Sequence, residues 1–259
     1  MKIVVLVKQV PDTEEERRLD VATGILDRKA AENVPDEISE RALEVALQYK
    51  DAHKDADVVV LSMGPDTVTK TLRKMLSMGA DSAVHVVDDA LAGSDVNRTS
   101  VVLAAALKHI GFDLVVAGNE STDGRGGVVP AMVAEHLRLP LLPSLNSIDV
   151  QEAAVSGDCS VDGGSLSLRA PLPAVVSVTE RVAEARFPNF KGIMKAKKKP
   201  SSVMSLAELG LDAASLNAGG RSVVVSATER PARTAGRKVV DDGRAAVELA
   251  EFLVAGRLI

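Results

Sequence analysis

Aromatic residues and cysteine are scarce in this chain of 259 residues. It contains no tryptophan, one tyrosine, four phenylalanines and one cysteine, Cys159. A single cysteine cannot form a disulfide within the chain, and the histidines and Cys159 do not have the spacing of a metal site. These absences exclude a small disulfide-stapled fold and indicate a core built from Val, Leu, Ile and Ala.

Long apolar runs are missing as well. The first one, Ile3 to Val7, has five residues before Lys8, which is too short for the core of a signal peptide. No run approaches the ~20 apolar residues that cross a bilayer. We therefore expect a cytoplasmic protein of a reducing compartment, without membrane insertion. The formal net charge of -5 argues against nucleic acid as the main partner, since any basic patch is then local.

Short apolar runs alternate with amphipathic stretches over the first half of the chain. Continuous apolar runs are typical of strands buried on both faces, and a 3.6-residue period is typical of helices. Such alternation predicts an α/β fold, a parallel-sheet sandwich with helices on both sides. The predicted strands cover 3–7, 58–63, 83–87 and 114–117, and the predicted helices cover 35–50, 68–78, 95–110 and 128–137.

The second half of the chain has a different pattern. Short alternating segments at 147–150 and 166–168, around a Gly- and Asp-rich turn, predict hairpin character at one edge of the sheet. The run 174–179 predicts the last strand of the main domain. Beyond it we expect a short helix that begins at the capping box Ser205 and Glu208 and ends at Gly210. A strand at 223–227, an extended stretch at 230–236 and a final helix at 244–254 complete the expected elements.

A glycine-rich stretch follows the predicted strand at 114–117, where parallel sheets bind ligands. Residues 118–127 read G-N-E-S-T-D-G-R-G-G and precede a predicted helix. Free amides at such a helix start favour phosphate, and the hydroxyls of Ser121 and Thr122 can add donors. The stretch is neither G-x-G-x-x-G nor a Walker loop. From the residues alone, a phosphate site and a flexible surface turn are therefore equal alternatives.

A basic segment, Arg186 to Pro200, stands out in this acidic chain. It reads R-F-P-N-F-K-G-I-M-K-A-K-K-K-P, with six basic residues, no acidic residue and two of the four phenylalanines. Pro188 and Gly192 argue against a continuous helix and predict a loop. Apolar side chains within a ring of lysines have the chemistry of a docking surface. The alternative is a solvated lysine run whose phenylalanines fasten the loop to its own core.

The segment resembles the recognition loop of the electron transfer flavoprotein β subunit, in which I-M-K-A-K-K-K at 193–199 is close to a fingerprint. The resemblance covers nearly the whole chain. It includes V-V-L-V-K-Q-V-P-D at 4–12, L-S-M-G-A-D at 76–81, A-G-N-E-S-T-D-G at 117–124 and R-T-A-G-R-K-V at 233–239. It implies a sandwich of the adenine-nucleotide-binding (Rossmann-like) type, with an exposed recognition loop and an extended C-terminal arm. The implied boundaries are 1–185, 186–200 and 201–259.

The resemblance also implies a nucleotide site for AMP, which has a structural role in this family. This chain departs from the family at Glu120, where Gln is common, and at Val128-Val129, where Gln-Val or Gln-Thr is common. A carboxylate at Glu120 repels phosphate, so we expect it to face the adenosine hydroxyls or another side chain. A second FAD in the same cavity, as in electron-bifurcating relatives, is the alternative. The implied nucleotide-binding residues are Leu6, Lys8, Asn33, Val34, Pro35, Asp36, Met63, Asn119, Glu120, Ser121, Thr122, Asp123, Gly124, Arg125, Gly126, Gly127, Val128 and Val129, in a stretch that runs on to Pro130.

A redox FAD, held mainly by a separate α subunit, is implied too. This chain is then a carrier subunit and not an enzyme, receiving electrons from acyl-CoA or related dehydrogenases and passing them toward a quinone oxidoreductase. The C-terminal arm is expected to embrace the α subunit. The implied docking residues in the recognition loop are Arg186, Phe187, Phe190, Ile193, Met194, Lys195, Lys197, Lys198 and Lys199.

Catalytic constellations are not apparent in the sequence. The four histidines are scattered, and Asp149, Asp158 and Asp162 lie in turn-like contexts where Asp serves local hydrogen bonding. Two other classes stay open: a stand-alone nucleotide-binding or nucleotide-hydrolysing protein, and a nucleic-acid-binding module that uses K-A-K-K-K. The first needs a complete phosphate loop and a catalytic acid, and the second conflicts with the acidic balance.

Overall fold

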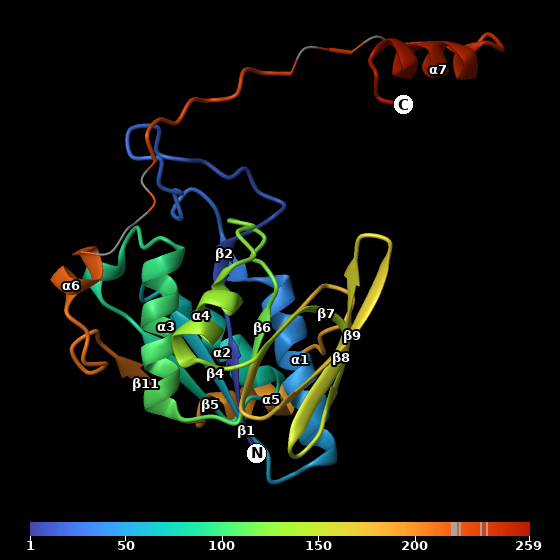
Figure 1. Ribbon diagram of the computed structural model, residues 1–259. Coiled ribbons are helices and arrows are strands. Elements are labelled where there is room, and N and C mark those ends of the chain that lie inside the picture. Colours follow the sequence, from blue (N-terminus) through green and yellow to red (C-terminus); the bar gives the residue numbers. More distant parts are fainter. Residues whose placement is uncertain (219–221, 223, 234, 237) are drawn as a thin grey trace.

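A nine-stranded sheet forms the centre of the computed structural model, which describes residues 1–218, 222, 224–233, 235–236 and 238–259 (Figure 1). The strand order is β11-β5-β4-β1-β6-β10-β7-β8-β9. Every pairing from β11 to β7 is parallel, whereas β7–β8 and β8–β9 are antiparallel. The strands are β1 (Lys2–Leu6), β4 (Asp57–Met63), β5 (Ser82–Val86), β6 (Leu114–Gly118), β7 (Leu141–Val150), β8 (Ala154–Val161), β9 (Gly164–Pro171), β10 (Ala174–Val178) and β11 (Ser201–Met204).

Helices cover both faces of this sheet. Alternate residues of β1 point to opposite sides, so Ile3 and Val5 lie in one apolar cluster and Val4 in the other. Helices α1, α2 and α5 lie on the first side, and α3 and α4 lie on the second. The fold is therefore the predicted α/β sandwich with a largely parallel sheet. The helices are α1 (Glu37–Ala52), α2 (Val68–Met78), α3 (Val96–Ile110), α4 (Val129–Leu137), α5 (Phe190–Ala196), α6 (Ala213–Ala218) and α7 (Ala245–Ala255), with a 3-10 turn η1 (Asp89–Leu91).

Helix boundaries follow the capping residues of the sequence. The Asp36 carboxylate accepts hydrogen bonds from the amides at the start of α1, and the Asp95 carboxylate does the same for α3. Gly79 and Gly111 end α2 and α3. Both glycines have a positive φ, 149° and 68° respectively, a conformation that residues with a Cβ rarely adopt. The prediction of these four helix ends is confirmed.

The expected hairpin is larger in the structure than in the prediction. Strands β7, β8 and β9 form a three-stranded antiparallel ribbon at the sheet edge, running well beyond the two short predicted segments. Its polar side chains form their own network, in which the Asp158 carboxylate accepts hydrogen bonds from the hydroxyls of Ser147 and Ser167. These bonds hold the pKa of Asp158 below its usual value. Asp158 lies within β8 and not in the turn-like context that the sequence analysis gave it, and its hydrogen-bond partners are on the two neighbouring strands.

The C-terminal part differs from its prediction in three places. Ser201–Met204 forms β11 and pairs with β5, so the sheet extends past residue 200. Ser205 and Glu208 make the reciprocal capping-box bonds, but the chain continues in turns rather than a helix. The predicted strand 223–227 is absent from its described residues, 224–227, and Val223 lies outside the described residues.

Farther along, the described residues of 230–236 form neither helix nor strand, and Thr234 lies outside them. The final helix is present as α7, which stands apart from the sheet at the end of this stretch (Figure 1). Within the described part of the chain, the structure has no helix of the length and apolar character that a bilayer crossing requires. The same residues contain no group of His, Cys, Asp and Glu side chains arranged to hold a metal ion.

Candidate functional site

The carboxyl ends of β1, β4 and β6 meet at one edge of the sheet. Parallel pairing sets β1 between β4 and β6, with Leu6 opposite Leu61 and Val5 opposite Val116. The loop after β6 therefore lies next to the residues that follow β1. A two-stranded ribbon of β2 (Gln9–Pro11) and β3 (Asn33–Pro35) adjoins this edge and leads into α1. This arrangement brings together the segments that the sequence analysis assigned to a nucleotide site.

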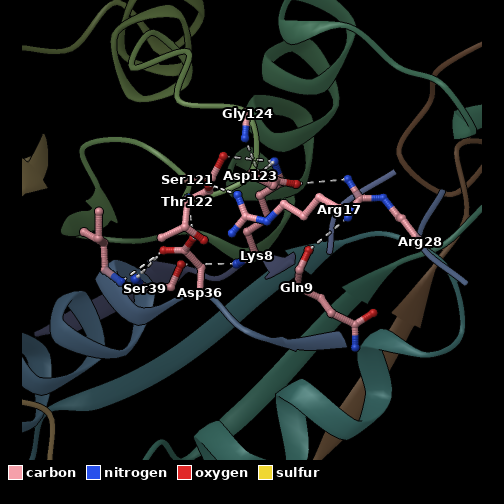
Figure 2. Close-up of polar contacts among 11 residues, drawn as sticks. Lys8, Gln9, Arg17, Arg28, Asp36, Ser39, Ser121, Thr122, Asp123 and Gly124 are labelled. Atoms are coloured by element: carbon pink, nitrogen blue, oxygen red, sulfur yellow. Dashed lines mark hydrogen bonds and ion pairs between the residues drawn. The ribbon is translucent and has the colours of Figure 1, made fainter. Parts of the chain in front are cut away.

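The loop after β6 is fixed to the segment that follows β1 by an ion pair (Figure 2). Lys8 Nζ donates to Asp123 Oδ1 at 2.7 Å and to Ser121 Oγ at 3.0 Å, and Arg28 Nη2 lies 3.3 Å from Asp123 Oδ2. Only 3% of the Asp123 side chain is exposed. Burial opposes ionisation of this carboxyl, but the hydrogen bond and charge of Lys8, with Ser121 and Arg28, lower its pKa below the usual value.

Asp36 ties the same loop to the start of α1. Its Oδ1 accepts from the amides of Ile38 and Ser39, at 3.0 and 3.4 Å. Its Oδ2 accepts from the amide and the hydroxyl of Thr122, at 2.7 and 2.9 Å. One buried carboxylate therefore caps a helix and holds the loop at once, as Figure 2 shows. Thr122 is thus not free as a phosphate donor through its hydroxyl, which the sequence analysis had suggested for it.

Two arginines that the sequence analysis did not select also contact this loop. Arg17 Nη1 donates to the main-chain oxygen of Thr122 at 2.5 Å, and Arg28 pairs with Asp123. Both belong to the stretch 12–32, which lies between β2 and β3. The only sequence signal there is the charge of Arg17 and Arg28, and charge in a long connection normally indicates solvation.

Several polar groups at the site lack a partner in the described part of the chain. The side-chain oxygens of Asn33 and Asn119 are buried without a hydrogen bond. Among the residues that the structure describes, the amides of Gly126, Gly127 and Val128 have no hydrogen-bond acceptor either, and no side chain caps α4. Buried polar atoms are normally paired, so the two asparagine oxygens indicate a missing ligand or water. Amides at the start of a helix suit a phosphate, and amide oxygens suit the hydroxyls or amino group of a nucleoside.

The glycines of this loop leave open space. A Cβ added to Gly126 would have Val96 Cγ1, at 3.9 Å, as its nearest neighbour, and Gly127 has a φ of 65°. Gly124 and Arg125 are exposed beside them, and Arg125 also has a positive φ, 46°. A bulky group can therefore approach the main chain here. These features fit a nucleotide phosphate.

The remaining residues of the predicted site lie at the same edge of the sheet. Leu6 and Met63 end β1 and β4, and Glu120 is half-buried in the loop. Val34, Pro35 and Thr122 line a cavity of about 320 Å³, the rest of whose lining is Val10, Asp12, Thr13, Glu14, Glu37, Glu40 and Lys74. That cavity is largely acidic and so is a poor phosphate site. Val128 is exposed and Val129 begins α4.

The recognition loop contains a helix, which corrects the prediction of a loop throughout. Asn189 accepts a hydrogen bond from the amide of Gly192 at 2.8 Å and caps α5. Gly192 packs against α2, because a Cβ on it would lie 2.3 Å from the main-chain oxygen of Ser77. The close contact with α2 explains why a glycine that locally disfavours a helix is accommodated inside one.

Two cations of the recognition loop bind internally. Arg186 pairs with Glu44 of α1, and Lys199 Nζ donates to the main-chain oxygens of Leu76 and Ala80, at 2.9 and 2.5 Å. Burial lowers the pKa of Lys199. The structure therefore gives these residues a holding role, which the sequence pattern did not predict. The apolar docking residues point outward: Phe187 is 94% exposed and Phe190 80%, with Ile193 and Met194 also exposed.

Comparison with known proteins matches this chain to one family. The family model described as "Electron transfer flavoprotein domain" matches residues 23–209. The β subunit of the electron transfer flavoprotein of Mycobacterium leprae is 51% identical, with 99% of each chain covered. The corresponding subunit of Megasphaera elsdenii is 33% identical over the full length of both chains. The "Caffeyl-CoA reductase-Etf complex subunit CarD" of Acetobacterium woodii is 32% identical, with 98% of this chain and 97% of that one covered.

Proposed function

This chain belongs to the electron transfer flavoprotein family as a β subunit, and from that membership we propose that it carries electrons in a heterodimer with an α subunit. The donor is an acyl-CoA or related dehydrogenase, and the electrons pass on toward a quinone oxidoreductase. The α subunit holds most of the redox FAD, and this chain closes the flavin site from one side. FAD supplies the electron-accepting chemistry when bound, and the residues of this chain bind partners and a second nucleotide.

The exposed recognition loop is the observation that carries the proposal. Phe190 is the first residue of α5 and Phe187 lies just before that helix, and both are almost fully exposed in a protein with few aromatics. Exposed apolar groups of this size are costly unless a partner covers them, and aromatic side chains are typical interface anchors. We assign Phe190 as the apolar anchor for the donor dehydrogenase.

The loop after β6 is proposed to bind AMP. The free amides of Gly126, Gly127 and Val128 receive the phosphate, and the unpaired oxygens of Asn33 and Asn119 accept from the nucleoside. Lys8 and Asp123 neutralise each other, so they hold the loop in shape rather than compete for the phosphate. The rest of the implied residues, from Leu6 and Met63 to Glu120 and Arg125, line the same edge of the sheet.

The C-terminal arm is proposed to pack on the α subunit. Helix α7 has no buried residue, although its side chains are largely apolar. Val247, Leu249, Phe252 and Val254 are all more than half exposed. An apolar helix that stands apart from its own domain needs another surface to cover it, and the second subunit of the heterodimer supplies one.

Nucleotide content tests the proposal directly. The chain is co-expressed with its α subunit, the complex is purified, and nucleotides are released by heat and quantified by chromatography. We expect one FAD and one AMP per heterodimer. Two FADs without AMP would favour the electron-bifurcating form with a second FAD in this site. Failure to form a flavin-containing complex would contradict the proposed function.

A further inference from the structure

Helix α2 presents a basic stripe on its outer side. Lys70, Arg73, Lys74 and Ser77 are spaced at i, i+3, i+4 and i+7, so they share one face of the helix. The three cations are exposed, whereas Val68, Leu72 and the other residues of the opposite face are buried in the core. A row of exposed cations on a helix is normally just solvated. It gains a binding role only where it adjoins an interaction surface.

The recognition loop lies at the end of this stripe. Ser77, its last residue, is the point at which Gly192 of α5 touches α2. Lys199, which lies just beyond the C-terminal end of α5, adds a second contact by donating to the main-chain oxygen of Leu76. Since the rise of a helix is 1.5 Å per residue, Lys70 lies roughly 10 Å along α2 from Ser77. The stripe therefore continues from the surface of α5 without an intervening element.

The free positive charge of this region lies on both helices. Within the described residues, Lys70 and Arg73 have no ion pair or side-chain hydrogen bond, whereas Lys74 pairs with Glu40. On the recognition loop the exposed cations without such a partner are Lys191, Lys195, Lys197 and Lys198. Arg186 and Lys199 bind internally, so they add little to the charge that faces outward. The chain as a whole has a net charge of -5, so these unpaired cations form a positive region on an otherwise acidic protein.

We infer that the docking surface for the donor dehydrogenase extends from the recognition loop onto α2, through Lys70 and Arg73. This inference rests on the proposed function. The partner surface it fits has an apolar pocket for Phe190 and carboxylates on the rim of that pocket, facing α2. Rim charges act mainly on the rate of encounter and on its salt dependence, and less on the tightness of the central contact. Lys70 and Arg73 are therefore specificity residues for the donor and take no part in the electron transfer itself.

Charge reversal on α2 tests this inference. Lys70→Glu and Arg73→Glu are made separately in the heterodimer, and steady-state rates are measured with the dehydrogenase from which the parent accepts electrons. Each variant should raise the KM for the flavoprotein about threefold or more at low ionic strength, with kcat unchanged. The dependence of kcat/KM on salt should become less steep than in the parent, because fewer favourable charges remain to be screened. Lys70→Gln should give a smaller change in the same direction.

Lys108→Glu is the matched control. Lys108 is an exposed lysine in the last turn of α3, on the opposite side of the sheet, and its reversal changes the net charge by the same amount. Equal KM values for the Lys70→Glu, Arg73→Glu and Lys108→Glu heterodimers would overturn the inference while leaving the proposed function intact. A parent heterodimer that accepts electrons from no dehydrogenase would overturn the proposed function itself, and the inference with it. Flavin content of each variant shows that assembly is preserved.

Discussion

Arg186 binds Glu44 at two points, with Nε 2.7 Å from Oε2 and Nη2 2.9 Å from Oε1. The amide of Arg186 also donates to Oε2 of Glu44, at 3.2 Å, and Nη2 lies 2.9 Å from Asp51 Oδ2. Only 7% of the Glu44 side chain is exposed. The hydrogen bond to Glu44 outweighs burial and raises the pKa of Arg186 further above its usual value. The entry to the recognition loop is thereby fastened to α1.

Arg186→Ala should lower the free energy of unfolding by about 2–4 kcal/mol, because it leaves Glu44 charged and buried without its partner. Urea unfolding of the heterodimer measures the change. Arg181→Ala is the control, since Arg181 lies 3.8 Å from Glu180 in an exposed pair and should cost less than about 1 kcal/mol. Similar losses in the two variants would contradict the holding role of Arg186.

Gly192→Ala should displace α5 from α2, because its Cβ would lie 2.3 Å from the Ser77 oxygen. We expect a higher KM with the donor dehydrogenase, since the exposed side chains of α5 lose their position. Gly164→Ala provides the comparison, because no atom of the described residues lies within 4 Å of a Cβ built there. The role of this contact in positioning α5 is refuted if Gly192→Ala reacts with the donor as the parent does.

Phe190→Ala should slow electron transfer from the dehydrogenase several-fold without unfolding the protein, because Phe190 is 80% exposed and supports no core. Loss of an aromatic hot spot typically costs about 2 kcal/mol or more of binding. Stopped-flow rates and the thermal midpoint Tm are measured together. Leu166→Ala, an exposed apolar residue on β9, should leave both unchanged. If the stopped-flow rates of Phe190→Ala equal those of the parent, Phe190 is not the anchor.

Asp123→Asn should destabilise the loop after β6 in a pH-dependent manner. The pKa of Asp123 is lower in the folded protein than its usual value of 3.8, so ionisation stabilises the fold. That contribution is complete above about pH 4 and disappears as the pH falls through the lower folded value. We expect the variant to be less stable than the parent by about 1–3 kcal/mol at pH 7.

Urea midpoints of parent and Asp123→Asn at pH 7 and at successively lower pH provide the measurement. Their difference should shrink once the pH is below 4. A difference that stays constant with pH would show that the charge of Asp123 does not stabilise the loop. Asp162→Asn, in the exposed turn between β8 and β9, should show little difference from the parent at any pH.

Local signals in the sequence were sufficient for the α/β framework. Asp36 and Asp95 begin their helices because a carboxylate can accept the free amides of the first turn, whatever the rest of the chain does. Ile3 to Val7 is apolar on both faces and so predicts a buried strand. Features of this kind depend on a few neighbouring residues, and the structure confirms them.

Features that depend on distant contacts could not be predicted in this way. Ser201–Met204 is short and mostly exposed, and it is a strand because β5 offers it an open edge. Gly192 disfavours a helix locally, but its contact with Ser77 requires the absence of a Cβ. The partners of Arg17 and Arg28 lie about a hundred residues away, in the loop after β6. No short-range pattern encodes these pairs.

The connection from β10 to β11 contains the recognition loop, and four strands, β6, β1, β4 and β5, lie between β10 and β11 in the sheet. With neighbouring strands about 4.8 Å apart, the two ends of the connection are roughly 24 Å from each other. Both ends of the connection are therefore anchored in strands of one rigid sheet, so the connection is not a freely moving loop. The outward side chains of this connection can be exchanged for those of a relative while its length and its two anchoring strands stay the same. We therefore expect the part of donor preference that resides in these outward side chains to be separable from folding, and the segment between Arg186 and Lys199 is a natural unit for transplanting that part.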